Sequence, residues 1–439
     1  MSLLKSTSEQ AFSILFVDRD TDEMEFVMKE LIYLTGQMNL PFFINEIEVL
    51  RKYFDNVYVL AYGNENKIEC DALARKYNFE YDFVLENQFS FTNIRNMIFN
   101  ITNKNILGEI KALIHTKRFN FKNLAYLYYY EWFSVVAENL IIKRLRNDSE
   151  IYLYSFWLSR PAYAISKFNT KGKNIKMIVS RSHRYDIYEE ENQFKYLPFR
   201  KYIDRNLNRI YFSSRDNLDY FKNKAYSKEL HAEYFLSYLG TRDFHVRKKY
   251  NRGKYEMVFA SCSNMIQRKR LDLIISLLSS PAFEKVKIKW LCIGDGELLD
   301  EIKSMAQIQL PKVEVFWTGR VSEEDIYKLY IKNDVDFFIN MSDSEGVPVS
   351  IMEALSLGIP CVARHVGGNA DIVNDKNGFL INKNEISSID LNRLSLKIIE
   401  VFNDKERYFC MMDEAFNTWN ERFNTEKNIA DFCNSIINK

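Results

Sequence analysis

Short apolar segments alternate with segments of helical periodicity along the whole chain. Many of the short segments are apolar at every position, which is the pattern of a strand in a parallel sheet covered on both faces. Repeated alternation of such strands with helices predicts a doubly wound α/β fold. The predicted strands are Phe12–Val17, Asn56–Ala61, Ile151–Phe156, Ile175–Ser180, Arg209–Ser213, Tyr255–Ser261, Lys287–Ile293, Val313–Trp317, Val335–Asn340 and Ile359–Ala363.

One segment between the two series of strands lacks apolar periodicity. Arg242–Lys254 carries six basic residues and a single acidic one. We interpret it as the linker between two α/β domains of comparable size, residues 1–245 and 250–415. The last segment, Asp413–Asn438, has a helical pattern and no strand after it.

Composition limits the class of protein. Of the 439 residues, 47% are hydrophobic and 27% are charged, which is the balance of a folded chain rather than a disordered one. The net charge of +1 gives no overall field that favours nucleic acid or acidic substrates. The six cysteines include no C-x-x-C pair, which favours reduced thiols in a cytosol. No apolar run is long enough to cross a bilayer, and Phe12–Val17 is typical of a strand rather than a signal peptide.

The densest group of candidate residues lies in residues 342–360 and follows a predicted strand. Pro348 suits the first turn of a helix and Gly358 suits its end, so a helix is predicted at about Pro348–Leu357. Its N-terminus would offer free N–H groups to a phosphate. Glu345 then lies in the preceding loop and Glu353 within the helix, where a carboxylate could bind sugar hydroxyls. The alternative is a helix cap with a surface glutamate.

Three more strand ends in the second half carry glycine or charged residues. Asn264 and Arg268-Lys269-Arg270 follow one strand, and three adjacent cations could hold a diphosphate, although a solvated basic turn is the alternative. Gly294-Asp295-Gly296-Glu297 follows another strand but lacks the third glycine of a dinucleotide-binding fingerprint. Thr318-Gly319-Arg320-Val321 follows a third. Carboxyl ends of parallel strands meet at one edge of the sheet, which favours a shared ligand site.

The first half contributes one candidate and one motif that we set aside. His183 stands among arginine and aspartate residues after an apolar strand, which makes it a candidate for a cleft, although a lone histidine is more often structural. Asp18-Arg19-Asp20 has the form of a metal-binding D-x-D, but it follows the first predicted strand and is interpreted as structural. Asp334-Val-Asp336 leads into a strand.

Taken together, these motifs resemble glycosyltransferase family 4. The resemblance lies in E-G-x-P-x4-E-A (Glu345 to Ala354), the upstream Lys269, G-D-G-E, T-G-R-V and G-G-N-A-D-I-V (367–373), in that order. It is strongest over residues 255–382. It implies the GT-B fold, in which two Rossmann-like domains face each other across a cleft and a C-terminal helix, here residues 416–439, packs back on the N-terminal acceptor-side domain. It also implies a retaining transferase that takes its sugar from a nucleotide donor and needs no metal or other cofactor.

The resemblance assigns roles to individual residues. Glu345 would lie against the donor sugar, Glu353 would bind the ribose, and Lys269 would hold the diphosphate. His183 would lie beside the reacting sugar. The remaining donor-binding candidates are Asn264, Arg268, Gly294, Arg320, Val321, Gly346, Val347, Pro348 and Val349. Pro348 has no N–H to give to a phosphate.

The chain departs from the family pattern at two positions. Asn264 stands where an arginine commonly accompanies the lysine, which Arg268 or Arg270 could compensate, and Asp371 replaces the usual glutamate of G-G-x-x-E. The resulting hypothesis is a cytoplasmic glycosyltransferase that builds a polysaccharide or a lipid-linked glycan. An epimerase or oxidoreductase of similar fold would need G-x-G-x-x-G after the first strand, where Asp18-Arg-Asp-Thr-Asp stands. A nucleic-acid-binding protein is the remaining alternative.

The middle of the chain is basic and aromatic. Residues 101–249 carry a net charge of +13, against −7 before them and −5 after them. Residues 124–146 predict one long helix with a buried stripe at Tyr126, Tyr130, Phe133, Ala137 and Leu140. Tyr128, Trp132 and Val135 fall off that stripe, and Lys111, Lys117, Arg118, Lys122, Lys143, Arg144 and Arg146 flank the helix. Aromatic and basic residues together suit an anionic membrane surface; the alternative is that the aromatic residues are all core.

Overall fold

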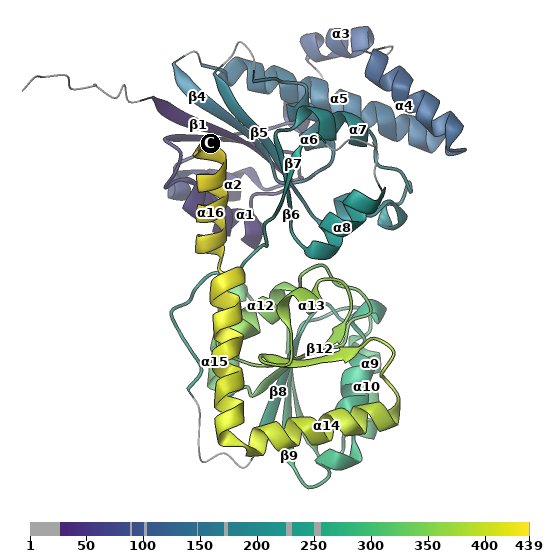
Figure 1. Cartoon of the computed structure of the whole chain (residues 1–439), viewed down its shortest axis with the longest axis vertical. Helices are drawn as coiled ribbons and strands as arrows, with labels where there is room; N and C mark the ends of the chain where they lie inside the picture. The colour runs from purple at the N-terminus through teal and green to yellow at the C-terminus, as the bar shows by residue number, and fades with distance from the viewer. Residues whose placement is uncertain are drawn as a thin grey trace, which may run out of the picture.

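The computed structural model describes residues 27–87, 90–100, 103–146, 148–170, 174–224, 231–249 and 256–438. Two parallel β-sheets form the centres of two successive halves of the chain (Figure 1). This confirms the doubly wound α/β class. The predicted strand Phe12–Val17 and the motif Asp18-Arg19-Asp20 lie outside the described residues.

The first sheet has seven strands in the order β3-β2-β1-β4-β5-β6-β7, all paired in parallel. The strands β1, β2 and β4 carry long buried runs and lie at its centre. The bounds are β1 Met28–Thr35, β2 Asn56–Ala61, β3 Glu80–Phe83, β4 Ser149–Ser155, β5 Ile175–Ser182, β6 Arg209–Phe212 and β7 Glu233–Leu236. The first described strand is therefore β1, which the hydrophobic pattern did not predict.

The second sheet has six parallel strands in the order β10-β9-β8-β11-β12-β13. Numbered along the chain within each sheet, both sheets begin with the order third, second, first, fourth, fifth, sixth. This is the strand order of a dinucleotide-binding fold. Such folds bind ligands where the strand order reverses, here between β8 and β11. The bounds are β8 Glu256–Cys262, β9 Lys287–Ile293, β10 Val313–Gly319, β11 Phe337–Asn340, β12 Cys361–His365 and β13 Gly378–Asn382.

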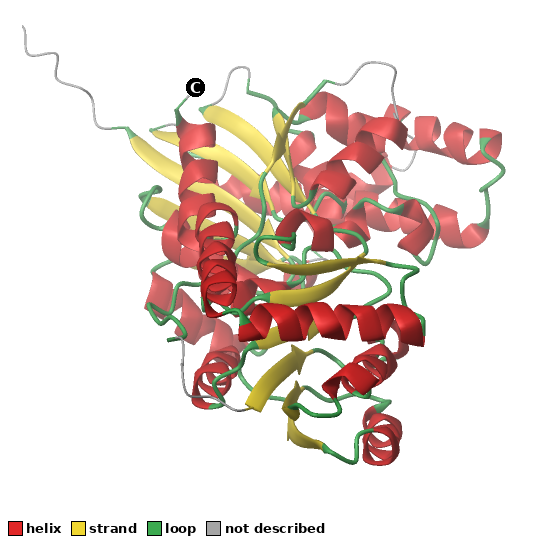
Figure 2. Cartoon of the chain, turned by 60° about the horizontal axis from the view of Figure 1, so that its bottom comes forward, coloured by secondary structure: helices red, strands yellow, loops and turns green. Residues whose placement is uncertain are grey.

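Helices cover both faces of each sheet (Figure 2). On the first sheet, α5 and α6 pack on one face and α1 on the other. The helices of the first half are α1 Pro41–Leu50, α2 Lys67–Tyr77, α3 Phe91–Asn100, α4 Lys104–His115, α5 Phe121–Arg144, α6 Arg160–Ser166, α7 Arg200–Asn206 and α8 Arg215–Lys224. Those of the second half are α9 Leu271–Leu278, α10 Leu299–Gln309, α11 Glu323–Lys332, α12 Val349–Ser356, α13 Asn369–Ile372, α14 Ser388–Asn403, α15 Lys405–Arg422 and α16 Thr425–Ile437.

The chain crosses back to the first sheet at its C-terminal end. Trp419 of α15 is fully buried in the core of the second sheet, whereas Phe432 of α16 is buried with residues of the first sheet (Figure 1). The crossing falls at Phe423–Asn424 rather than at 416, because α15 stays packed on α12 to its last turn. There the N–H of Thr241 donates to the carbonyl of Phe423 at 3.0 Å, so the outgoing and returning segments run side by side.

The segment interpreted as a linker is anchored to the second sheet. Lys248 is buried, and its ammonium lies 2.7 Å from a carboxylate oxygen of Asp336 and 3.3 Å from one of Asp334. Asp336 also accepts the N–H of Val258 at the start of β8. The two aspartates that the pattern placed merely before a strand therefore attach the basic segment to it.

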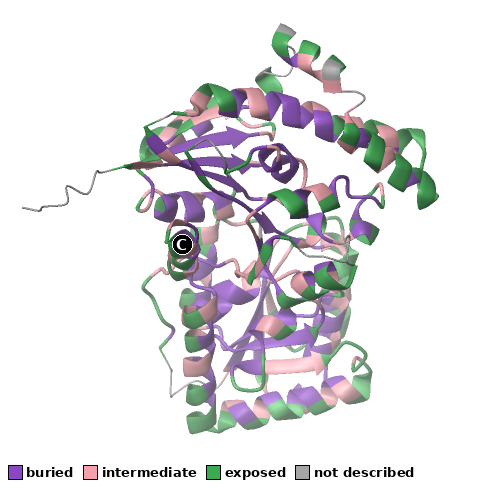
Figure 3. Cartoon of the chain, turned by 45° about the horizontal axis from the view of Figure 1, so that its top comes forward, coloured by how far each residue is buried: buried purple, intermediate pink, exposed green. Residues whose placement is uncertain are grey.

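The long basic helix is confirmed as α5, and its off-stripe residues turn inward. Val135 is buried, while Tyr128 and Trp132 are half-buried against the core of the first sheet (Figure 3). Arg144 pairs with Glu80 and lies over the ring of Tyr58. Tyr128 and Trp132 of α5 are thus turned partly toward the core, while Phe121 and Tyr129 of the same helix are exposed. None of the helices within the described ranges is both long and apolar enough to span a membrane.

Candidate active site

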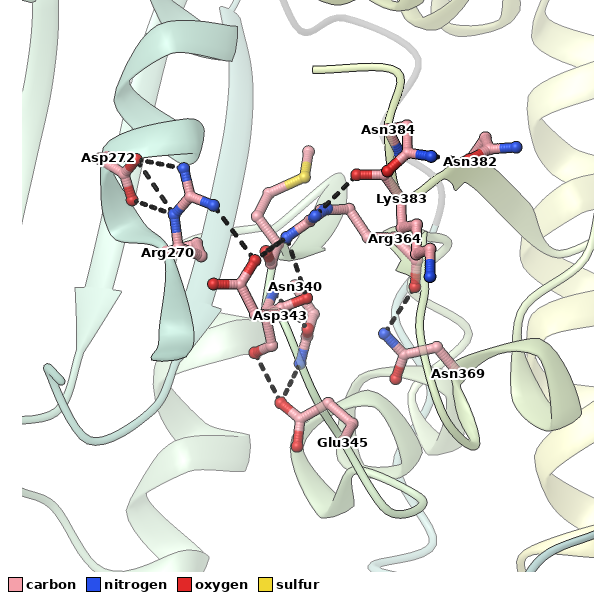
Figure 4. A network of polar contacts seen from close by, with 12 residues as sticks. Arg270, Asp272, Asn340, Asp343, Glu345, Arg364, Asn369, Asn382, Lys383 and Asn384 are labelled. Atoms are coloured by element: carbon pink, nitrogen blue, oxygen red, sulfur yellow. Dashed lines mark hydrogen bonds and ion pairs between the residues drawn. The ribbon is translucent and has the colours of Figure 1, made fainter. Parts of the chain in front are cut away.

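The loop after β11 carries the predicted carboxylate Glu345. Its side chain is buried, and one carboxylate oxygen accepts the hydroxyl of Ser342 at 2.6 Å and the amide of Asn340 at 3.2 Å (Figure 4). The same oxygen lies 2.6 Å from the ammonium of Lys269, in the loop after β8. The strand order brings these two loops together, since β8 and β11 are neighbours at the switch point of the second sheet.

The pair determines the charge state of Glu345. Burial alone would raise the pKa of this carboxyl, but the ammonium of Lys269 and the bonds from Ser342 and Asn340 outweigh burial and lower the pKa below its ordinary value. Glu345 is therefore an anion at neutral pH, and Lys269 is held beside it at the edge of the sheet. The arrangement offers one fixed negative and one fixed positive charge to a ligand.

The two glycines of G-G-N-A-D make the close packing of this loop possible. A Cβ at Gly367 would lie 1.9 Å from the carbonyl oxygen of Glu345, and its φ is +48°. The N–H of Gly368 donates to the carbonyl of Gly346 at 2.8 Å. A side chain at either glycine would push the Glu345 loop away from β12, which explains the spacing of this motif in physical terms.

Of the two cations that were expected to compensate for Asn264, Arg270 has other partners. Arg270 pairs with Asp272 at 2.8 Å and with Asp343 at 3.1 Å, and Arg364 of β12 donates to the same Asp343 (Figure 4). Arg270 is thus part of the scaffold of the loop. Asn264 and Arg268 are exposed, and their side chains bond to no other described residue.

The two remaining glycine motifs meet each other. The N–H of Gly294 donates to the carbonyl of Gly319 at 2.9 Å, so the turns after β9 and β10 form one edge. Gly294 has φ +126°, and a Cβ there would lie 2.0 Å from the carbonyl oxygen of Ser263. Next to this edge Arg320 is exposed and Val321 is half-buried.

The helix after Glu345 begins one residue later than predicted. Pro348 is its N-cap and α12 runs Val349–Ser356, so Pro348 loses no hydrogen bond; Val347 packs at the edge of the core. Gly358 ends the helix at φ +76°, as expected. Glu353 is buried on α12, and burial together with the nearby Glu323 raises its pKa to about 8.

His183 follows β5 in the first half. Its ring lies against the rings of Phe156 and Trp157, and its Nε2 is 3.0 Å from the carbonyl oxygen of Phe156. Burial and the nearby Arg181 lower the pKa of His183 to about 3, so the ring is neutral at physiological pH. Asp186 accepts the backbone N–H of His183 at 2.8 Å and fixes the turn.

Arg184, which lies in the same predicted stretch as His183 but was given no role there, joins the two halves of the site. Its guanidinium donates to the carbonyl of Glu345 at 3.1 Å, which sets the residue after His183 against the catalytic candidate loop. Asp371 accepts the N–H of Arg215 at 3.1 Å and makes a second contact between the halves. The sequence pattern that could have indicated Arg184 is a charged residue just after the end of a buried strand. The pattern that could have indicated Arg364 is a charged residue within an otherwise apolar strand.

The comparisons with known proteins agree with this geometry. Residues 243–413 match the family model described as glycosyl transferases group 1. A poly(ribitol-phosphate) alpha-N-acetylglucosaminyltransferase of Staphylococcus aureus is 24% identical over 338 residues, which are 76% of this chain and 62% of that protein. An Escherichia coli UDP-Gal:alpha-D-GlcNAc-diphosphoundecaprenol alpha-1,3-galactosyltransferase is 36% identical over 115 residues, 26% of this chain and 27% of that protein. The chain thus spans less than two thirds of either relative.

The fold has been seen before in the crystal structure of HepE from Anabaena, solved with UDP and glucose. That structure superposes with a TM-score of 0.61 at 16% identity, over 93% of this chain and 99% of HepE. The protein has the GT-B fold. Its residues 243–413 resemble the glycosyl transferases group 1.

Proposed function

We propose that this protein is a retaining, metal-independent glycosyltransferase that moves a sugar from a nucleotide-sugar donor to a polysaccharide or lipid-linked acceptor. The observation that carries the proposal is the buried pair of Lys269 and Glu345 at the switch point of the second sheet. In this proposal Lys269 binds the leaving diphosphate, whose developing charge is the main electrostatic demand of the reaction. The ionised Glu345 binds the donor sugar beside it.

The other site residues have roles that follow from their positions. The free N–H groups at the start of α12 bind the phosphates, without a contribution from Pro348, which has no N–H. Glu353 accepts the ribose hydroxyls, and the edge formed by Gly294, Arg320 and Val321 meets the base. His183, neutral and held by its turn, offers a hydrogen bond to the reacting sugar rather than a charge.

The acceptor class comes from the relatives. One relative is named for transfer to a poly(ribitol-phosphate), the other for transfer to a diphosphoundecaprenol-linked sugar. Both are anionic glycan carriers, and the net charge of +13 over residues 101–249 suits such an acceptor. We therefore propose a bacterial-type surface glycan as the product.

The proposed location is the cytoplasm, with the enzyme bound to the inner face of the membrane. The surface that suits a bilayer is the first turn of α5 together with the turn before it, where Phe119 is 50% exposed and Phe121 is 84% exposed beside Lys117 and Lys122. Sedimentation with vesicles tests this: binding should need anionic lipid, fall with salt, and be lost in Phe119→Ser/Phe121→Ser. Wild-type-like sedimentation of this variant would refute the location.

The proposed function is tested by measuring nucleotide binding and sugar transfer. A thermal-shift screen of nucleotides and nucleotide sugars should give one nucleotide family that raises the melting temperature. With that donor, Glu345→Ala should abolish transfer and Glu301→Ala, an exposed glutamate on α10, should not. Activity near that of the wild type in Glu345→Ala would refute the assignment, and a large melting loss would indicate a structural role instead.

A further inference from the structure

A cavity lies in the first half of the chain, between α4, α7 and the segment that follows the 3-10 helix η3 (Glu189–Glu191). Its volume is about 600 Å³, within the range of small-ligand pockets. It is lined by Lys104, Asn105, Gly108, Glu109, Ala112, Leu113, Thr116, Arg118, Glu189, Tyr196, Leu197, Phe199, Arg200, Lys201, Tyr202, Arg205 and Lys224. The helix α4 is one of its walls and lies at the outer end of the molecule (Figure 3).

Both acidic side chains in the lining are already satisfied. Glu189 lies 2.8 Å from the guanidinium of Arg118, and Glu109 accepts the hydroxyl of Tyr196 at 2.5 Å. The cations Lys104, Lys201 and Arg205, which are exposed, form no ion pair with any described residue. The wall therefore has an excess of positive charge that the protein itself does not neutralise.

Gly108 lies in the interior of α4 without a structural reason to be glycine. A Cβ built on it has no atom within 4 Å. Glycine weakens a helix interior relative to alanine, because it loses more backbone entropy on folding. A glycine on the wall of a cavity is explained when a ligand approaches the backbone closely.

The cavity adjoins the reacting centre along the chain. Its segment Glu189–Phe199 continues from the turn that holds His183, and Arg184 in that turn pairs with Glu191. Arg200 of the cavity wall donates to the carbonyl of Asp186, whose carboxylate accepts the N–H of His183, so one wall of the cavity contacts the turn that holds His183. Lysine is a compact point charge and arginine a two-pronged donor, and both suit phosphate oxygens.

We propose that this cavity binds a phosphate group of an anionic acceptor glycan, at a unit remote from the one that receives the sugar. This rests on the proposed function. The acceptor is then selected by its phosphate as well as by the sugar at its end, and the cavity keeps a long chain bound between transfers.

Binding is measured by calorimetric titration with inorganic tripolyphosphate, in a Lys269→Met/Glu345→Gln background that removes the phosphate contact of the donor site. Tricarballylate serves as the carboxylate probe. Lys104→Gln/Lys201→Gln/Arg205→Gln should weaken tripolyphosphate binding at least about tenfold. The control, Lys111→Gln/Lys122→Gln/Lys143→Gln, changes the same charge at exposed residues outside the cavity and should retain affinity.

A second variant removes the concern that charge changes disturb folding. Gly108→Leu places a side chain in the open space of the cavity and should raise the melting temperature while it abolishes tripolyphosphate binding. In the otherwise unaltered enzyme, the same variant should raise the KM for a phosphate-bearing acceptor and leave donor hydrolysis by water unchanged. If neither the wild type nor any variant hydrolysed the donor, the result would count against the proposed function and not against phosphate binding in the cavity.

Three results would overturn the proposal. Equal weakening by the cavity and control variants would show a diffuse charge effect. Tricarballylate binding as tight as tripolyphosphate would show a carboxylate site. Binding to phosphatidylglycerol vesicles that Gly108→Leu abolishes, with no binding of tripolyphosphate in solution, would show that the phosphate belongs to a lipid headgroup.

Discussion

Replacing Lys269 by methionine should have two separable effects, one on stability and one on nucleotide binding. The side chains of Lys269 and Glu345 are only 17% and 8% exposed, and their charged atoms are 2.6 Å apart. Methionine keeps the length of the lysine and removes its charge. A buried carboxylate is then left with the hydroxyl of Ser342 and the amide of Asn340 as partners.

The stability loss follows from the burial of Glu345. Breaking a buried ion pair costs about 3 kcal/mol. For a domain of this size, that corresponds to a fall of about 6–12 °C in melting temperature. The nucleoside diphosphate should bind about ten- to a hundredfold more weakly, because a charge-assisted contact to phosphate is lost, while the nucleoside should bind as before.

The loss of stability in Lys269→Met should depend on pH, because it comes from the ionised carboxylate of Glu345. In the wild type the pKa of Glu345 lies below 4.5, so its ionisation adds stability above pH 4.5 that is lost as the pH falls through the folded-state pKa. Without the lysine, burial raises that pKa above its unfolded value, and stability is lost as the pH rises. The difference in melting temperature between the two proteins should therefore be large at pH 8 and small near pH 4.

The double variant Lys269→Met/Glu345→Gln is the decisive control. It removes both charges, so the melting temperature should return toward that of the wild type while diphosphate affinity stays low. Differential scanning calorimetry and calorimetric titration measure the two quantities separately. If the double variant regained diphosphate affinity, Lys269 would act only through Glu345, and the reasoning would be refuted.

Three further perturbations test other parts of the site. Nucleotide affinity should rise between pH 6 and 8 in the wild type and stay flat in Glu353→Gln, because the ionised form of a carboxyl whose pKa is about 8 accepts ribose hydroxyls more strongly than the protonated form; a flat wild-type titration would contradict this. Gly294→Ala should weaken nucleotide binding and lower the melting temperature, whereas Gly319→Ala, with no atom near its Cβ, should have the smaller effect. Arg184→Ala should lower kcat at unchanged nucleotide affinity, with partial rescue by Arg184→Lys; an unchanged kcat would exclude a role for its contact with Glu345.

The strands that the hydrophobic pattern predicted have two neighbours in their sheets, except for the edge strand β10. Lys287–Ile293 and Asn56–Ala61 match β9 and β2 at both ends. Three of the missed strands, β3, β7 and β13, are at sheet edges, where strands are short and one side needs no partner. The fourth, β1, carries Lys29 and Glu30 in its first half, and Glu30 is buried there against Ser149, which an apolar pattern cannot show.

The first-half part of the site was less predictable for a different reason. Glu345, Lys269 and the glycine motifs each follow a strand of one sheet. They come together because the carboxyl ends of parallel strands meet at the same edge. The contact of Arg184 with Glu345 depends on how two separate sheets are placed, which is decided by the crossing segments near Thr241 and Phe423. The argument against an oxidoreductase rests on other residues than expected, since Gly36-Gln37-Met38 follows β1 and also lacks the glycine fingerprint.

In the proposed function, Glu345 is the residue at which the contact between the two halves and the donor site meet. Its carboxylate is held by Lys269 and Ser342 of its own half, while its backbone carbonyl accepts from Arg184 of the other half. Gly367 leaves room for that carbonyl, because a side chain there would occupy its position. Any relative movement of the halves therefore shifts the backbone that carries the carboxylate. Because a displacement of about 1 Å can cost about a hundredfold in rate, a donor bound by both halves would align Glu345 and complete the site in the same step.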